Sequence, residues 1–118
     1  MLLAYVEPRK EKITLISIPR DLWVPLPIAS DNPHFKINNA YALGIDNNRF
    51  PNKPDEYRGV GGGGALARKV ISEVTGLSVD YFVSLNFTGF EKSIDILGGV
   101  DVKVNKSFED PFYPKSLS

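Results

Sequence analysis

Two short apolar runs separated by six mostly charged residues open the chain. The runs are residues 2–6 (LLAYV) and residues 13–18 (ITLISI), and the segment EPRKEK between them contains Pro8. Apolar runs of this length that flank a polar turn are typical of two antiparallel strands. We therefore expect a β-hairpin here, which would begin a sheet.

The second run ends in a proline that is followed by an arginine and an aspartate. Pro19 cannot continue a central ladder, so Arg20 and Asp21 should emerge at a strand end, where α/β sheets often place their ligands. A guanidinium suits an oxyanion such as a phosphate, and the carboxylate beside it can orient it, bind a metal or accept a proton. An ordinary surface turn with an ion pair is the alternative interpretation.

The next segment, residues 22–27 (LWVPLP), is extended and apolar. Its two prolines favour an edge strand or the wall of a loop over a central strand. Trp23 in this segment is a candidate for covering a pocket. The alternative is that its indole ring closes the edge of the core.

A long loop follows. Residues 28–64 are rich in Pro, Asn, Asp and Gly, and only residues 39–43 suggest a short helical turn. We expect residues 45–64 to be a mobile loop, and residues 45–58 to be a disordered insertion. The position of the loop after the Arg–Asp pair makes a substrate-facing role reasonable.

The clearest helix signal covers residues 65–75. Gly76 stands at the expected C-terminal stop. Four apolar residues fall on one face of this helix: Leu66, Val70, Ile71 and Val74.

A strand, a helix and a strand are expected after it. Residues 81–85 (YFVSL) indicate a strand, and Thr88 with Glu91 forms a capping-box signature for a second helix. The apolar side of that helix should be buried, and it comprises Phe90, Ile94 and Leu97. The alternating sequence VDVKV (residues 100–104) predicts a half-exposed strand.

The order of these elements predicts an α/β fold. We expect one domain over residues 1–118, built as a three-layer α-β-α sandwich with a mixed central sheet that is incomplete at both ends. Residues 2–6 already read as a buried strand, so we expect a truncated chain.

Composition narrows the classes of function. Lys and Arg total 14, as do Asp and Glu, so the basic field that non-specific nucleic-acid binding requires is absent. The chain has no cysteine and only one histidine, His34. These counts give no support to disulfides, thiolate metal sites, a histidine-based zinc site or a Ser-His-Asp triad.

Three further residues are candidates for ligand binding. Lys36 and Asn38 supply donors suited to phosphate or sugar oxygens, although a solvated lysine and a turn asparagine are the alternatives. Arg68 stands near the start of the helix, behind the glycine run at residues 61–64. A glycine-rich helix N-terminus can hold an anion, but a flexible hinge is the more common role for such a run.

Four ordered strings together resemble the LytR-CpsA-Psr family of cell-wall glycopolymer ligases. They are ISIPRD (residues 16–21), KINNAY (36–41), VDYFVSLNFTGF (79–90) and DILGGVDV (95–102). The resemblance covers most of residues 2–110 and is low through residues 45–58.

The resemblance implies a transfer reaction. In it, a glycopolymer such as a teichoic acid or a capsule, carried on a polyprenyl pyrophosphate, is attacked by a peptidoglycan hydroxyl and stays attached through a phosphodiester. Arg20 and Asp21 match the active-site motif, so we expect Arg20 to clamp the pyrophosphate and Asp21 to act as its orienter or as the general base. Lys36, Asn38 and Arg68 are then expected to bind substrate, and Mg²⁺ is the implied cofactor.

The chain also departs from the family pattern. The family has an aspartate before the first strand that contributes to the magnesium site, an arginine-rich stretch after the last one and a transmembrane anchor. We therefore expect this chain to be part of a catalytic domain with weak or no turnover by itself, from a protein at the extracytoplasmic face of the membrane. A non-catalytic module that binds polyprenyl phosphate or wall polymer is the alternative, and transcriptional regulation is disfavoured by the neutral charge.

Overall fold

The computed structural model describes residues 1–107. The chain divides into two compact units, Met1–Ser84 and Leu85–Ser118, the second of which is described up to Ser107. Each unit is treated by itself below.

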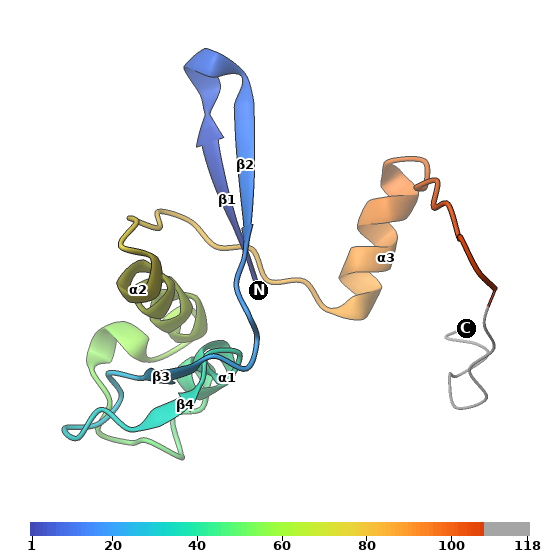
Figure 1. Ribbon diagram of the computed structural model, residues 1–118. Coiled ribbons are helices and arrows are strands. Elements are labelled where there is room, and N and C mark those ends of the chain that lie inside the picture. Colours follow the sequence, from blue (N-terminus) through green and yellow to red (C-terminus); the bar gives the residue numbers. More distant parts are fainter. Residues whose placement is uncertain (108–118) are drawn as a thin grey trace. The chain divides into compact units, whose positions relative to one another are not determined.

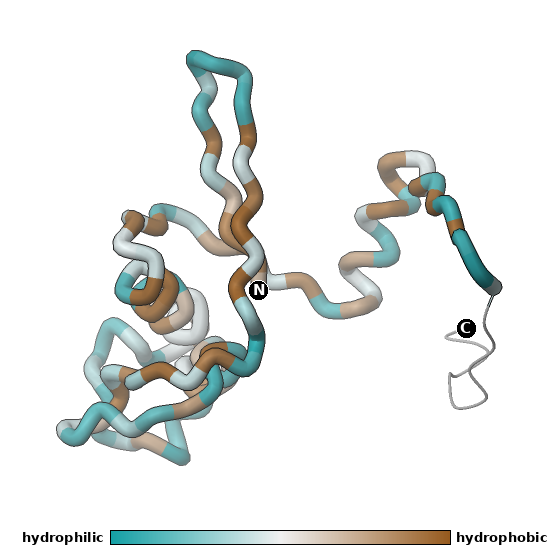
Figure 2. Tube along the Cα trace, viewed as in Figure 1, coloured by the Kyte–Doolittle hydropathy of each residue, from teal (hydrophilic) through white to brown (hydrophobic). Residues whose placement is uncertain are grey.

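The first unit begins with the expected hairpin. Strand β1 (Leu2–Glu7) pairs antiparallel with β2 (Lys12–Ser17), from Leu2 opposite Ser17 to Glu7 opposite Lys12 (Figure 1). The short 3-10 helix η1 (Pro8–Lys10) and Glu11, whose φ is 50°, close the turn. The hydrophobic runs are visible along both strands in Figure 2. The predicted hairpin is confirmed, but most of its side chains are exposed.

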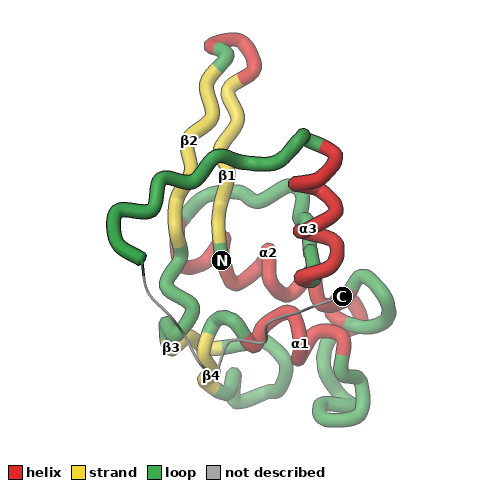
Figure 3. Tube along the Cα trace, turned by 90° about the vertical axis from the view of Figure 1, so that its right-hand side faces the viewer, coloured by secondary structure: helices red, strands yellow, loops and turns green. Residues whose placement is uncertain are grey.

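A second, separate pair of strands follows. β3 (Trp23–Pro25) pairs antiparallel with β4 (His34–Lys36), with Trp23 opposite Lys36. Successive side chains of a strand point to opposite faces, and accordingly Val24 is buried while Trp23 is exposed. In Figures 1 and 3 the two strand pairs lie at opposite ends of this unit.

Two helices pack against each other beside β4. They are α1 (Asn39–Ile45) and α2 (Gly62–Thr75). A Cβ atom added to Gly44 of α1 would lie 2.5 Å from the Cα of Gly63 in α2. Glycine at both positions therefore lets the two backbones touch.

Helix α2 differs from the sequence prediction at its start and agrees at its end. It begins three residues earlier than the expected residue 65, because the glycines at 62–64 are buried in its first turn. Gly76 ends it with φ 71°, as predicted. Three residues of the predicted apolar face are buried, whereas Val74 is exposed.

The core lies where the second strand pair, α1 and α2 meet. Its buried members are Ile18, Val24, Leu26, Ile28, Ile37, Ala40, Leu43, Tyr57, Leu66, Val70 and Ile71. The β1–β2 hairpin contributes only the partly buried Leu3 and Ile16.

The segment predicted as a loop at residues 45–64 makes specific contacts. It contains the 3-10 helix η2 (Asp55–Tyr57), and the side chains of Lys53 and Tyr57 are 1% and 3% exposed. These buried side chains attach the segment to α1 and to the core. Its mobility stays a prediction.

The second unit holds one helix, α3 (Phe87–Ile96). The Asn86 side chain caps it by accepting a hydrogen bond of 2.7 Å from the backbone N–H of Gly89. The predicted capping box at Thr88 and Glu91 is therefore wrong, since the helix starts before Thr88. Phe90 and Leu97, predicted to be buried, are exposed.

The predicted strands at residues 81–85 and 100–104 are not formed. A strand exists only where a neighbouring backbone completes its ladder, and within residues 1–107 no segment pairs with either stretch. The described fold mixes helices and strands, as the α/β prediction requires. Its strands form two antiparallel two-stranded sheets, and the three-layer sandwich with a mixed sheet is not confirmed.

Among residues 1–107, no helix combines the length and the apolar character needed to cross a bilayer.

Candidate functional site

The Arg–Asp pair occupies a turn between the two strand pairs. The backbone N–H of Leu22 donates to the carbonyl of Pro19 at 3.2 Å, which places Arg20 and Asp21 at the centre of the turn. Both side chains are exposed. The sequence prediction that Pro19 ends the strand and presents this pair agrees with the backbone, because β2 ends at Ser17.

Backbone hydrogen bonds tie this turn to the end of β4. The N–H of Ile37 donates to the carbonyl of Leu22 at 2.8 Å, and the N–H of Asn38 donates to the carbonyl of Arg20 at 3.3 Å. The pairing of β3 with β4 therefore continues into the Arg–Asp turn. Two strings that are separated in the sequence, ISIPRD and KINNAY, meet here as a result.

The side chains of the two strings also meet. Lys36 Nζ lies 2.8 Å from Asp21 Oδ1. The hydrogen bond and the charge of Lys36 hold the pKa of the Asp21 carboxyl below its usual value, and the charge of Arg20 adds to this effect. Asp21 therefore stays ionised at neutral pH. We call Arg20, Asp21 and Lys36 the RDK cluster.

Asn38 stands next to this cluster, directly before α1. It occupies the N-cap position, but its side chain makes no capping hydrogen bond. Its Oδ1 atom is buried and has no hydrogen-bond partner among the described residues. A buried acceptor without a donor is uncommon, so this atom is a site where a hydrogen bond is missing among the described residues.

Arg68 takes a different position. Its Nη1 donates to the carbonyl of Asp80 at 2.8 Å, and its Nε is buried without a partner among residues 1–107. No hydrogen bond or ion pair within the described range joins Arg68 to the RDK cluster. The structure thus brings together four of the five predicted site residues.

Two glycines of the run before Arg68 serve helix packing. Gly62 and Gly63 lie against backbone atoms of Tyr57, Tyr41 and Gly44 so closely that a Cβ atom at either position would clash. These two glycines are part of the contact between α1 and α2, whereas a Cβ atom at Gly61 would meet nothing within 4 Å. An anion-binding or hinge role for the run stays a prediction.

The described residues contain no preformed cluster of magnesium ligands. No group of three or more His, Cys, Asp or Glu side chains lies together within residues 1–107. Mg²⁺ favours carboxylates and substrate phosphates, and the one carboxylate of the RDK cluster already pairs with an ammonium group. His34, on β4, is exposed.

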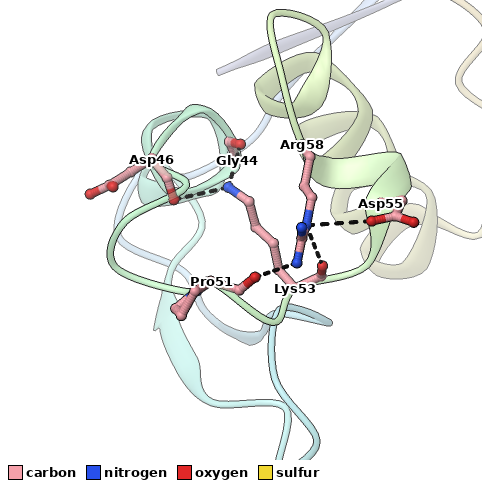
Figure 4. A network of polar contacts seen from close by, with 6 residues as sticks. All are labelled: Gly44, Asp46, Pro51, Lys53, Asp55 and Arg58. Atoms are coloured by element: carbon pink, nitrogen blue, oxygen red, sulfur yellow. Dashed lines mark hydrogen bonds and ion pairs between the residues drawn. The ribbon is translucent and has the colours of Figure 1, made fainter.

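Sequence reasoning missed one polar network close to α1. The buried Lys53 ammonium donates to the carbonyl of Leu43 at 2.9 Å. It also donates to the carbonyls of Gly44 and Asp46, at 2.6 and 2.9 Å (Figure 4). These are carbonyls at the C-terminal end of α1, where intrahelical partners are lacking. Burial lowers the pKa of Lys53.

Arg58 supports the same loop. It donates to the carbonyls of Lys53 and Pro51, and it pairs with Asp55 at 3.5 Å (Figure 4). A lysine that caps a helix from outside the helix gives no local sequence signal, because cation preferences at C-termini concern the last helical turn. The network stabilises the backbone that follows the candidate site.

Two proteins of similar sequence carry the same name. The chain is 33% identical to a protein of Oceanobacillus iheyensis over 96% of its own length and 31% of that protein. It is 27% identical to a protein of Enterococcus faecalis over 95% of the chain and 30% of that protein. Both are named polyisoprenyl-teichoic acid–peptidoglycan teichoic acid transferase TagU.

A relative with a different name also matches. The regulatory protein MsrR of Staphylococcus aureus is 33% identical over 81% of this chain and 24% of that protein. The chain thus spans less than a third of the length of these relatives. No solved structure is significantly similar to it.

The model of the LytR_cpsA_psr family matches residues 1–115, nearly the whole chain. The sequence resemblance is therefore confirmed: the chain belongs to the LytR-CpsA-Psr family.

Proposed function

We propose that this chain is the part of a glycopolymer transferase that holds the pyrophosphate of a polyprenyl-linked donor, such as a polyisoprenyl-linked teichoic acid. Its family membership and the names of its TagU relatives support this proposal. The observation that carries it is the RDK cluster, because two strings typical of the family converge through the pairing of β3 with β4.

The cluster offers two cations to an anion. Arg20 takes part in none of the ion pairs formed among residues 1–107, so its guanidinium can form a bidentate contact with phosphate oxygens. The ammonium of Lys36, which pairs with the neighbouring Asp21, is a second positive charge. Together they would stabilise the negative charge that develops on the leaving phosphate.

In the proposed reaction, a peptidoglycan hydroxyl oxygen bonds to the phosphorus that carries the glycopolymer. The bond from this phosphorus to the bridging oxygen breaks, and polyprenyl phosphate leaves. The hydroxyl proton is released, and the glycopolymer stays attached through a phosphodiester.

Asp21 fits the role of an orienter better than that of a general base. A general base works best when its pKa lies near the working pH, whereas Lys36 and Arg20 lower the pKa of this carboxyl. We assign Asp21 the task of positioning Lys36. Magnesium remains an expectation from the family, and no step is assigned to it.

Titration with a soluble analogue tests the anion site. Farnesyl pyrophosphate should bind the wild-type chain, and Arg20→Ala should weaken binding about tenfold to hundredfold, the range expected for one lost charge-assisted contact. Arg9→Ala is the matched control, because Arg9 is an exposed arginine in the hairpin turn. Asp21→Asn should retain binding. Equal affinities of the wild type and Arg20→Ala would refute the site.

The non-catalytic alternative predicts the same binding results. It differs in the full-length protein, where the transferase requires that Arg20→Ala abolish attachment of polymer to peptidoglycan. An unchanged amount of wall-bound polymer in such a strain, with the variant protein present at normal levels, would favour the binding module.

A further inference from the structure

The only tryptophan of the chain lies beside the RDK cluster. Trp23 is the first residue of β3 and stands directly opposite Lys36 on β4. Directly paired residues of an antiparallel ladder have their Cβ atoms about 5 Å apart on the same face. Lys36 in turn contacts Asp21, two residues before Trp23. The indole and the Lys36–Asp21 ion pair therefore lie on one outer face of this strand pair.

Trp23 does not close the core. Its side chain is 63% exposed, whereas its neighbour Val24 is 5% exposed and packs inward. Other large apolar residues of this chain are exposed as well, so exposure alone carries no argument. What distinguishes Trp23 is its fixed position across from a cation that also touches the Arg–Asp turn.

The chemistry of this face suits one class of ligand. An indole ring presents a partly negative face, and the C–H face of a pyranose ring is apolar and slightly positive. The neighbouring ammonium and guanidinium groups suit phosphate oxygens. A ligand that joins a sugar ring to a phosphate would satisfy both halves of the face at once.

We propose that Trp23 is a sugar-binding residue, which stacks on the pyranose ring bonded directly to the phosphate of the donor. This inference rests on the proposed function, since it takes the RDK cluster to hold that phosphate. It adds a specificity contact: the site selects a sugar-linked phosphate over a bare one.

Isothermal titration calorimetry with three probes tests the inference. The probes are N-acetylglucosamine 1-phosphate, inorganic phosphate and the phosphate-free disaccharide di-N-acetylchitobiose. The wild type should bind the sugar phosphate about fivefold to tenfold more tightly than inorganic phosphate, which is the gain expected from one well-placed aromatic contact. The emission of Trp23 should shift only with the sugar phosphate, and it reports on this site alone because the chain has a single tryptophan.

Three variants sharpen the test. Trp23→Ala should bind inorganic phosphate as the wild type does and lose the advantage of the sugar phosphate. Trp23→Phe keeps an aromatic ring and should retain part of it. Tyr5→Ala, which removes an exposed aromatic ring from β1, should change neither affinity.

Each remaining outcome has a definite meaning. If phosphate binding depends on Arg20 but the sugar adds nothing, or if the advantage persists in Trp23→Ala, the Trp23 inference is wrong and the proposed function stands. If the disaccharide binds as tightly as the sugar phosphate, the ring belongs to an acceptor glycan, and the inference is also overturned. If neither phosphate probe binds, the proposed function and the inference fail together.

Discussion

Replacing Lys53 by methionine should destabilise the chain strongly. Methionine fills a similar volume but donates no hydrogen bond, so the carbonyls of Leu43, Gly44 and Asp46 would lose their partner. An unsatisfied buried acceptor costs about 1 to 3 kcal/mol. We take the low end for each carbonyl, because removing a buried charge offsets part of the loss, and expect a decrease of about 3 kcal/mol in the free energy of unfolding.

A loss of this size is large for one domain, because native stabilities are about 5 to 15 kcal/mol. At about 4 °C per kcal/mol, it corresponds to a decrease in Tm of about 12 °C. Urea unfolding followed by circular dichroism measures it directly. Lys69→Met is the control, since Lys69 forms an exposed ion pair with Glu73 that is worth about 0.5 kcal/mol at most.

The pH dependence of the free energy of unfolding is a second test of the role of Lys53. Burial lowers the pKa of Lys53 below 10.5, so the unfolded chain binds this proton more tightly than the folded chain does. This contribution to stability therefore rises with pH in the window just below 10.5, and Lys53→Met should lack the rise. If Lys53→Met unfolds within about 0.5 kcal/mol of the wild type, the reasoning about the carbonyl network is wrong.

Two further predictions concern the same unit. Gly44→Ala should lower the free energy of unfolding by about 1 to 3 kcal/mol, because the added methyl group would meet the backbone of Gly63. Gly61→Ala, with open space around it, should change this free energy little. Equal urea midpoints for both variants would contradict the close helix contact. Burial raises the pKa of Tyr57 to about 12. The wild type should therefore lose about 2 to 3 kcal/mol of stability as pH rises from 10 to 12, and Tyr57→Phe should not. Matching alkaline unfolding curves of the two proteins would contradict the burial of this hydroxyl.

Elements with local signals could be predicted from the sequence. The β1–β2 hairpin follows from two apolar runs around a charged turn, and the end of α2 follows from Gly76. The short helical turn expected at residues 39–43 is the helix α1. In each case a turn, a cap or a periodicity within a few residues determines the structure.

Elements that depend on distant partners could not be predicted in this way. The strand pattern of residues 81–85 forms no strand, because strand formation needs a ladder that the pattern itself does not contain. From the sequence, Lys53 is expected to be a surface lysine in a loop. Only the folded path of residues 46–53 brings its ammonium to the carbonyls at the C-terminal end of α1.

In the candidate site, too, the residue types could be predicted from local sequence, whereas their contacts could not. Arg20, Asp21 and Lys36 could be named from two strings, because their chemistry suits a phosphate. Their contact depends on the register of β3 and β4, which no local pattern fixes, and the pairing of Trp23 with Lys36 depends on the same register. The roles of these residues stay predictions until the binding experiments are made.

The β1–β2 hairpin has a consequence for the chain in solution. Both of its outer edges present unpaired backbone N–H and C=O groups within the described residues, and exposed apolar side chains such as Val6, Ile13 and Leu15 line the strands. Such edges are templates for adding a strand from another molecule, and charged residues that would block the addition are concentrated at the hairpin tip. We therefore expect any self-association of this chain to use these edges, and to increase with protein concentration.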